Sequence, residues 1–102
     1  MLSPELKAQI IKKYAMHTND TGSLEVQIAI LIAEINDIAE HLKQHKKDFS
    51  SKRGLIRKVA QRRRFLKELQ KESQERYDAL MKKVSSDKSL GAIEIEELPN
   101  NI

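Results

Sequence analysis

Aliphatic residues recur at alternating spacings of four and three over one stretch of the chain: Leu24, Ile28, Leu31, Ile35, Ile38 and Leu42. This period places all of these side chains on one face of an α-helix. It predicts a helix over about residues 24–44, roughly 30 Å long. Further apolar residues between these positions widen the face, so we expect the helix to pack against more than one neighbour and to be the central element of the fold.

The residues before this helix predict a short N-terminal helix that ends near Met16. Ser3 can cap it, and Pro4 is tolerated at its first position. Its apolar residues share one face: Leu6, Ile10, Ile11 and Tyr14. A polar run at residues 17–22 favours a turn, after which Ser23 can cap the central helix.

A third, long helix is predicted from about Ser50 to Lys71. The break before it is placed at residues 45–49, because Asp48 and Ser50 are turn and capping residues. The expected inner face of this helix consists of Leu55, Ile56, Val59, Leu66 and Leu69. Its basic residues are expected to point away from that face: Arg57, Lys58, Arg62, Arg63 and Arg64.

A short fourth helix should begin at Ser73 and reach Val84, since its apolar residues follow the i, i+3, i+4, i+7 pattern. The expected fold is therefore all-α, with four helices: a short N-terminal helix plus a bundle built on a long helical hairpin. We expect one domain over residues 1–84. The tail, residues 85–102, has one lysine and four acidic residues and is expected to be disordered, although residues 92–96 alternate as a strand would.

Positive charge is concentrated in residues 43–67. This stretch has eleven Lys and Arg residues and one acid, Asp48, whereas the rest of the chain has eight basic and fourteen acidic residues. The two parts therefore carry net charges of +10 and −6. A charge distribution of this kind attracts a polyanion, either a nucleic acid or an anionic membrane. The basic stretch could also be a helix face that is charged only to stay solvated. Such faces usually mix glutamate with lysine, whereas this stretch has a single acid.

Composition and motif context argue against several classes of site. The chain has no cysteine, so disulfides and thiolate metal sites are excluded, and no apolar run approaches membrane-spanning length. His41 and His45 have a metal-ligand spacing, but the surrounding lysines oppose a cation. Ser51 could act as a nucleophile with a histidine and an aspartate, but the chain offers no glycine-rich loop that would bind an oxyanion or a phosphate beside it. We expect no enzyme activity, no metal and no cofactor, in a cytoplasmic protein.

Two polar clusters remain as candidate binding residues. Thr21, Gly22 and Ser23 form a turn and a cap, and free N–H groups at a helix start can hold a phosphate, with Gln27 one turn further along. A plain turn and cap would explain the same residues. The second cluster runs from a helix end through a turn, and its side chains could project in one direction: His41, His45, Asp48 and Ser51.

Several separated motifs closely resemble the family of bacterial small-subunit ribosomal protein fifteen. They agree with it in order and spacing, within a match over about residues 3–84: residues 19–31, 40–42, 45–48, 51–55 and 61–63. The resemblance implies a structural, non-catalytic, four-helix protein that binds the central domain of small-subunit ribosomal RNA. It also implies contact with neighbouring small-subunit proteins and with large-subunit RNA. The sequence does not tell a cytoplasmic from an organellar ribosome.

The resemblance also implies which residues bind RNA. The segment matching Thr21, Gly22 and Gln27 contacts a three-way RNA junction, together with Arg64 and its neighbours. The turn matching the second polar cluster contacts the minor groove of an adjoining RNA helix. The residues expected to bind RNA are Thr21, Gly22, Ser23, Gln27, His41, His45, Asp48, Ser51, Lys52, Arg53, Arg57, Arg63 and Arg64.

The chain departs from the family pattern at two places. Glu68 stands where the family usually has an aromatic residue, and it cannot stack and carries a charge unfavourable near phosphate. The acidic tail also continues beyond the usual ending of the family. Two alternatives to ribosomal RNA stay open: a basic helical bundle that binds an acidic protein or an anionic membrane surface, and a DNA-binding helical domain.

Overall fold

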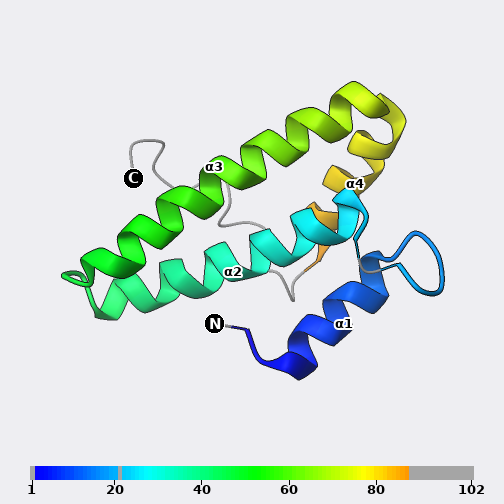
Figure 1. The fold of residues 1–102 in the computed structure, drawn as a ribbon. Helices are drawn as coiled ribbons and strands as arrows, with labels where there is room; N and C mark the ends of the chain where they lie inside the picture. Colours follow the sequence, from blue (N-terminus) through cyan, green and yellow to red (C-terminus); the bar gives the residue numbers. More distant parts are fainter. Residues whose placement is uncertain (1, 21, 88–102) are drawn as a thin grey trace.

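The structure is a computed structural model that describes residues 2–20 and 22–87. Its helices are α1 (Pro4–Tyr14), α2 (Leu24–Gln44), α3 (Phe49–Glu72) and α4 (Gln74–Ser86). α2 and α3 lie side by side as a long hairpin, α1 packs against α2, and α4 folds back from the end of α3 (Figure 1). The predicted all-α fold built on a long helical hairpin is confirmed. No helix within the described ranges is long and apolar enough to cross a membrane.

Each helix begins with a capping side chain that accepts a hydrogen bond from a backbone N–H of the first turn. The four bonds are Leu6 N to Ser3 Oγ (3.2 Å), Val26 N to Ser23 Oγ (3.3 Å), Ser51 N to Asp48 Oδ1 (3.0 Å) and Arg76 N to Ser73 Oγ (3.2 Å). These bonds satisfy donors that the helices themselves leave unpaired. Because Asp48 is the cap, α3 begins at Phe49, one residue earlier than predicted. α1 ends at Tyr14, two residues earlier than predicted.

The core lies where α1, α2, α4 and the C-terminal half of α3 meet. Its buried members are Ile10, Tyr14, Val26, Ile28, Ala29, Ile32, Ala33, Leu69, Leu80 and Val84. α2 supplies half of them and contacts both α1 and α3, as its wide apolar face predicted. The first three residues of the predicted tail are ordered: Ser85 and Ser86 belong to α4, and Asp87 is buried. The predicted disorder of residues 88–102, including the possible strand at 92–96, stays a prediction because these residues lie outside the described ones.

The inner face of α3 differs from the prediction at two positions. Ile56 is exposed at 43 %, and Arg62 is half-buried at the place between Val59 and Leu66 on the seam. Burial, and then the charge of Arg63, lower the pKa of Arg62, and its buried Nη1 has no hydrogen-bond partner among the described residues. The expectations that Ile56 points inward and that Arg62 points away were therefore wrong. The aliphatic stem of arginine allows it to occupy a partly apolar position.

A partly buried ion pair fastens α4 to the start of α2. Arg76 Nε and Nη2 donate to the two carboxylate oxygens of Glu25, at 2.7 and 2.6 Å, and Arg76 Nη1 donates to Glu72 at 2.8 Å. The hydrogen bonds from Arg76 lower the pKa of Glu25, and those to Glu25 raise the pKa of Arg76. The pair crosses 51 residues of sequence, and the local sequence patterns did not indicate it.

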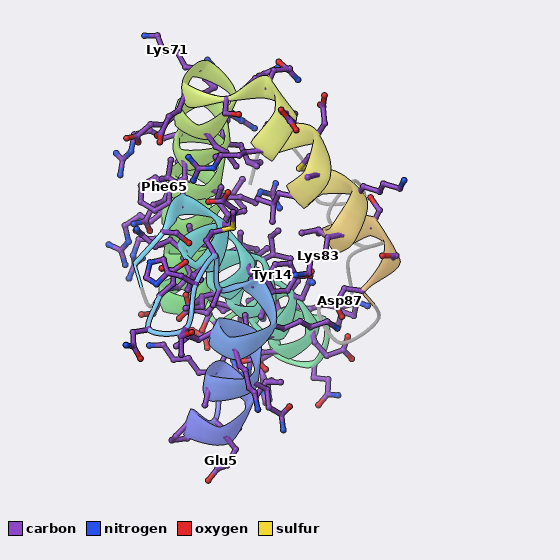
Figure 2. All side chains as sticks on the ribbon, turned by 90° about the vertical axis from the view of Figure 1, so that its right-hand side faces the viewer. Glu5, Tyr14, Phe65, Lys71, Lys83 and Asp87 are labelled. Atoms are coloured by element: carbon purple, nitrogen blue, oxygen red, sulfur yellow. The ribbon has the colours of Figure 1, made fainter. Side chains whose placement is uncertain are left out.

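A second polar group fastens α1 to the end of α4. The Tyr14 hydroxyl donates to Asp87 Oδ2 at 2.6 Å, and Lys13 Nζ lies 3.0 Å from Asp87 Oδ1. Lys83 Nζ donates to the Lys13 carbonyl at 2.6 Å and lies 4.7 Å from the centre of the Tyr14 ring. Figure 2 shows Tyr14, Lys83 and Asp87 gathered at this place. Burial, and then the bond to Asp87, raise the pKa of Tyr14.

Candidate nucleic-acid interface

The four residues of the second polar cluster come together at the turn between α2 and α3, as predicted. Asp48 is their centre: it accepts from Ser51 N (3.0 Å), from Ser51 Oγ (2.7 Å) and, at 2.8 Å, lies within hydrogen-bond distance of His41 Nε2. The rings of His41 and His45 stack with their centres 4.5 Å apart. We call His41, His45, Asp48 and Ser51 the turn cluster.

Asp48 is held as a carboxylate and stays partly accessible. Its hydrogen bonds, first to the side chain and backbone of Ser51 and then to His41, lower its pKa. A carboxylate offers about four acceptor positions, of which these bonds use three. The side chain is 33 % exposed. Asp48 can therefore cap α3, join it to α2 and still accept a hydrogen bond from outside the protein.

The start of α2 is organised by Asp20, which the sequence pattern placed only in the polar turn of residues 17–22. Its buried carboxylate accepts from three backbone N–H groups, those of Met16 (2.8 Å), Gly22 (3.1 Å) and Ser23 (2.8 Å). The bonds from Ser23, Met16 and Gly22 lower the pKa of Asp20. A short acidic residue directly before Thr-Gly-Ser was the available signal, because aspartate often binds backbone N–H groups two or three residues ahead.

These bonds change what this end of the molecule can offer to a ligand. The N–H groups of Gly22 and Ser23 donate to Asp20, and Ser23 Oγ caps α2. The amides of Gly22 and Ser23 are therefore not free to hold a phosphate, and the expected phosphate contact at this helix start stays a prediction. Gln27 Nε2 donates to the Gly22 carbonyl at 2.6 Å, which fixes the direction of the Gln27 side chain. Thr21 lies outside the described residues.

Most of the predicted basic residues line the outer side of α3. Arg53, Arg57, Arg63 and Arg64 are exposed, and Lys52 is half-buried. Within residues 2–20 and 22–87, Arg53, Arg57 and Arg63 form no ion pair, whereas Lys58 pairs with Glu34 at 3.3 Å. We call Lys52, Arg53, Arg57, Arg63 and Arg64 the basic band.

A groove that His41, His45 and Ser51 of the turn cluster help to line is acidic along α2. Glu34, Asp37 and Glu40 of α2 line it, opposite Lys58 of α3. Phosphates are repelled by carboxylates, so a polyanion is expected to approach from the basic band rather than along this side of α2. The turn cluster and the start of α2 lie at opposite ends of this 21-residue helix, about 30 Å apart.

Comparisons with known proteins agree with this architecture. A family model described as Ribosomal protein S15 matches residues 7–86, which is all four helices except the start of α1. Small ribosomal subunit protein uS15 of Carboxydothermus hydrogenoformans is 54 % identical over 83 residues, 81 % of this chain and 93 % of the relative. The uS15 protein of Pediococcus pentosaceus is 54 % identical over 81 residues, which are 79 % of this chain and 91 % of the relative. The uS15 protein of Thermotoga maritima is 49 % identical over 83 residues, which are 81 % of this chain and 92 % of the relative.

Proposed function

Since this chain belongs to the ribosomal protein S15 family, we propose that it is a structural component of the small ribosomal subunit that binds the subunit's RNA. The observation that carries the RNA contact is the arrangement on one rigid hairpin: a cationic outer face on α3 with a polar cluster at either end of α2. The basic band supplies affinity for phosphates, and the two clusters supply selectivity for a folded RNA.

The turn cluster is suited to the minor groove of an RNA helix. That groove is wide and shallow in A-form RNA and displays guanine amino groups and 2′-hydroxyls. The remaining acceptor position of Asp48 fits an amino donor. Ser51 Oγ donates its proton to Asp48, so its lone pairs are left to accept from a 2′-hydroxyl. His41 directs Nε2 at Asp48 and keeps Nδ1 for a further contact.

The start of α2 and the adjoining part of α3 are proposed to contact a three-way RNA junction. We assign Gly22, Gln27 and Arg64 to this contact, together with Thr21, from the family resemblance. Two contacts about 30 Å apart require an RNA that holds a junction and a helix at a fixed separation. Glu68 is exposed on α3 but cannot stack on a base, so we assign it no junction contact.

The remaining partners follow from the family alone. We propose that neighbouring small-subunit proteins and the RNA of the large subunit, across the subunit interface, contact this protein on the ribosome. The proposal includes no catalytic step. The alternatives, an acidic protein, an anionic membrane and duplex DNA, explain the basic band but give no role to a polar cluster at each end of α2.

Binding measurements separate these possibilities. The purified chain is titrated with a transcript of the small-subunit central-domain junction, with a scrambled RNA of equal length, with duplex DNA and with anionic vesicles. We expect clear preference for the junction transcript, and co-sedimentation with small subunits at low salt. Equal affinity for the junction and the scrambled RNA, or absence from the subunit fractions, would refute the proposal.

A further inference from the structure

An exposed stripe on α3 mixes apolar and cationic side chains and belongs to neither polar cluster. Phe49 is 61 % exposed and Ile56 is 43 % exposed. The two residues are seven positions apart, with Lys52 and Arg53 three and four positions after Phe49, so all four lie on one face of the helix. We call Phe49, Lys52, Arg53 and Ile56 the Phe49 stripe.

The position of the Phe49 ring distinguishes it from the other phenylalanine of the chain. Phe65 is half-buried and packs against the core, as expected for a large apolar side chain. The Phe49 ring is exposed to solvent instead of packing against the core. Lys52 Nζ lies over this ring, 5.4 Å from its centre. Exposure of one apolar residue is ordinary in a folded protein. Here an exposed aromatic ring, two cations and an exposed isoleucine follow one another along a single line.

The positive charge around the Phe49 stripe favours a negatively charged partner. Residues 49–67 contain no acidic residue, and Lys46 and Lys47 are exposed in the turn just before Phe49. An apolar protein surface placed on the stripe would remove Lys52 and Arg53 from water without supplying counter-charges. A nucleotide supplies both complements, because its base has a face that stacks on an aromatic ring and its phosphates pair with flanking cations.

We propose that the Phe49 stripe is a stacking platform for one unpaired RNA base, with Lys52 and Arg53 holding the phosphates on either side of it. This inference rests on the proposed function. Phe49 directly follows Asp48, the centre of the turn cluster, so the stacked base belongs to a bulge or strand end next to the RNA helix that Asp48 contacts. Ile56 extends the apolar surface beyond the ring by two helical turns.

The test uses the fact that the chain has no tryptophan. Phe49→Trp preserves a stacking surface and places a single fluorescent reporter in the stripe, whereas Phe49→Leu keeps an apolar side chain and removes the ring. Phe65→Leu is the matched control, since the same change is made at a half-buried position. Wild type and all three variants are titrated with the central-domain junction transcript, after circular dichroism has shown that they are folded.

We expect Phe49→Leu to weaken binding by at least about fivefold, the lower range for loss of one aromatic stacking contact. Phe49→Trp should bind within about twofold of wild type, with its emission quenched by the stacked base. Phe65→Leu should lower thermal stability and weaken RNA binding less than Phe49→Leu does, because Arg64, which lies 5.6 Å from the centre of the Phe65 ring, keeps its charge. Lys52→Ala should reduce the salt dependence of binding, which Phe49→Leu should leave unchanged because it removes no charge.

Failure of this inference differs from failure of the proposed function. If Phe49→Leu binds the junction transcript with wild-type affinity, and Phe49→Trp emission stays unquenched at RNA saturation, the stacking platform is overturned. The proposed function then still stands. Absence of wild-type binding to the junction transcript overturns both. Normal RNA affinity of Phe49→Leu, combined with its loss from subunits reconstituted with the other small-subunit proteins, would assign the stripe to a protein neighbour and also overturn the inference.

Discussion

At the scale of single residues, Asp48 joins structural and binding roles in one carboxylate. It caps α3, it bonds to His41 at the end of α2, and it keeps part of its surface in solvent. A change that removes the whole side chain therefore removes a helix cap together with any RNA contact. Asparagine separates the two roles, because it caps a helix about as well as aspartate but carries no negative charge.

We predict different outcomes for Asp48→Asn and Asp48→Ala. The asparagine variant should melt close to wild type, whereas the alanine variant should melt about 4–8 °C lower because the cap is lost. Both should bind the junction transcript about tenfold more weakly and scrambled RNA almost unchanged, since the base contact is selective. Thermal denaturation and RNA titration measure these effects. Equal losses on both RNAs would contradict the assigned role of Asp48.

Asp20 makes stability depend on pH in a direction that can be worked out. The bonds from Ser23, Met16 and Gly22 keep its pKa below the ordinary value, so the folded chain binds fewer protons than the unfolded chain in acid. This contribution is present in full above the unfolded pKa of about 3.9 and is lost as the pH falls through the lower folded pKa. Asp20→Asn should therefore flatten the decline in unfolding free energy below about pH 4, measured by urea denaturation. Parallel curves for variant and wild type would refute this role.

At the scale of elements, local sequence patterns predicted most of the helices and their caps. Ser3, Ser23 and Ser73 cap helices as expected, because a capping bond joins residues three positions apart and depends little on the rest of the fold. The inner face of α3 was harder to predict. Ile56 lies about 100° around the helix from Leu55, which places it outside the seam that Leu55 begins, and an arginine, Arg62, completes that seam.

The attachment of α4 depends mainly on the buried half of the Arg76 network. Glu25 is almost completely buried and Glu72 is 55 % exposed, although both carboxylates bond to the same guanidinium. We predict that Glu25→Gln lowers the free energy of unfolding by about 2 kcal/mol, less than the full cost of a broken buried pair because Arg76 is partly solvated. The matched change Glu72→Gln should cost at most about 0.5 kcal/mol. Urea unfolding compares the two, and equal effects would contradict this division.

At the scale of the whole molecule, charge is separated along the sequence and then gathered on one side of α3. The sequence predicted this polarity because burial of an apolar seam directs most of the intervening basic residues outward. It could not predict which distant residues meet: Glu25 with Arg76, or Tyr14 with Asp87. These contacts cross 51 and 73 residues, and no local pattern identifies the partner of a polar side chain. The turn cluster was predicted because its members are close in sequence.

The basic band should determine how RNA binding responds to salt. Arg63 is exposed and forms no ion pair within the described ranges, so its loss should remove about one phosphate contact. We predict that Arg63→Ala lowers the slope of log affinity against log salt by about one unit, on junction and scrambled RNA alike. Lys7→Ala, an exposed cation on α1 far from the band in sequence, should leave the slope unchanged. An unchanged slope in Arg63→Ala would show that the band does not contact phosphates.

The link between Tyr14 and Asp87 imposes an order on how the protein is completed during its own synthesis. Translation produces α1 first, yet the partner of the Tyr14 hydroxyl is added 73 residues later. α1 can pack against α2 once both have left the translating ribosome, but the Tyr14 hydroxyl gains its partner only after Asp87 has also emerged. The first helix to be made therefore gains its last polar contact only when α4 is complete, and a nascent chain that stalls within α4 lacks the Tyr14–Asp87 bond.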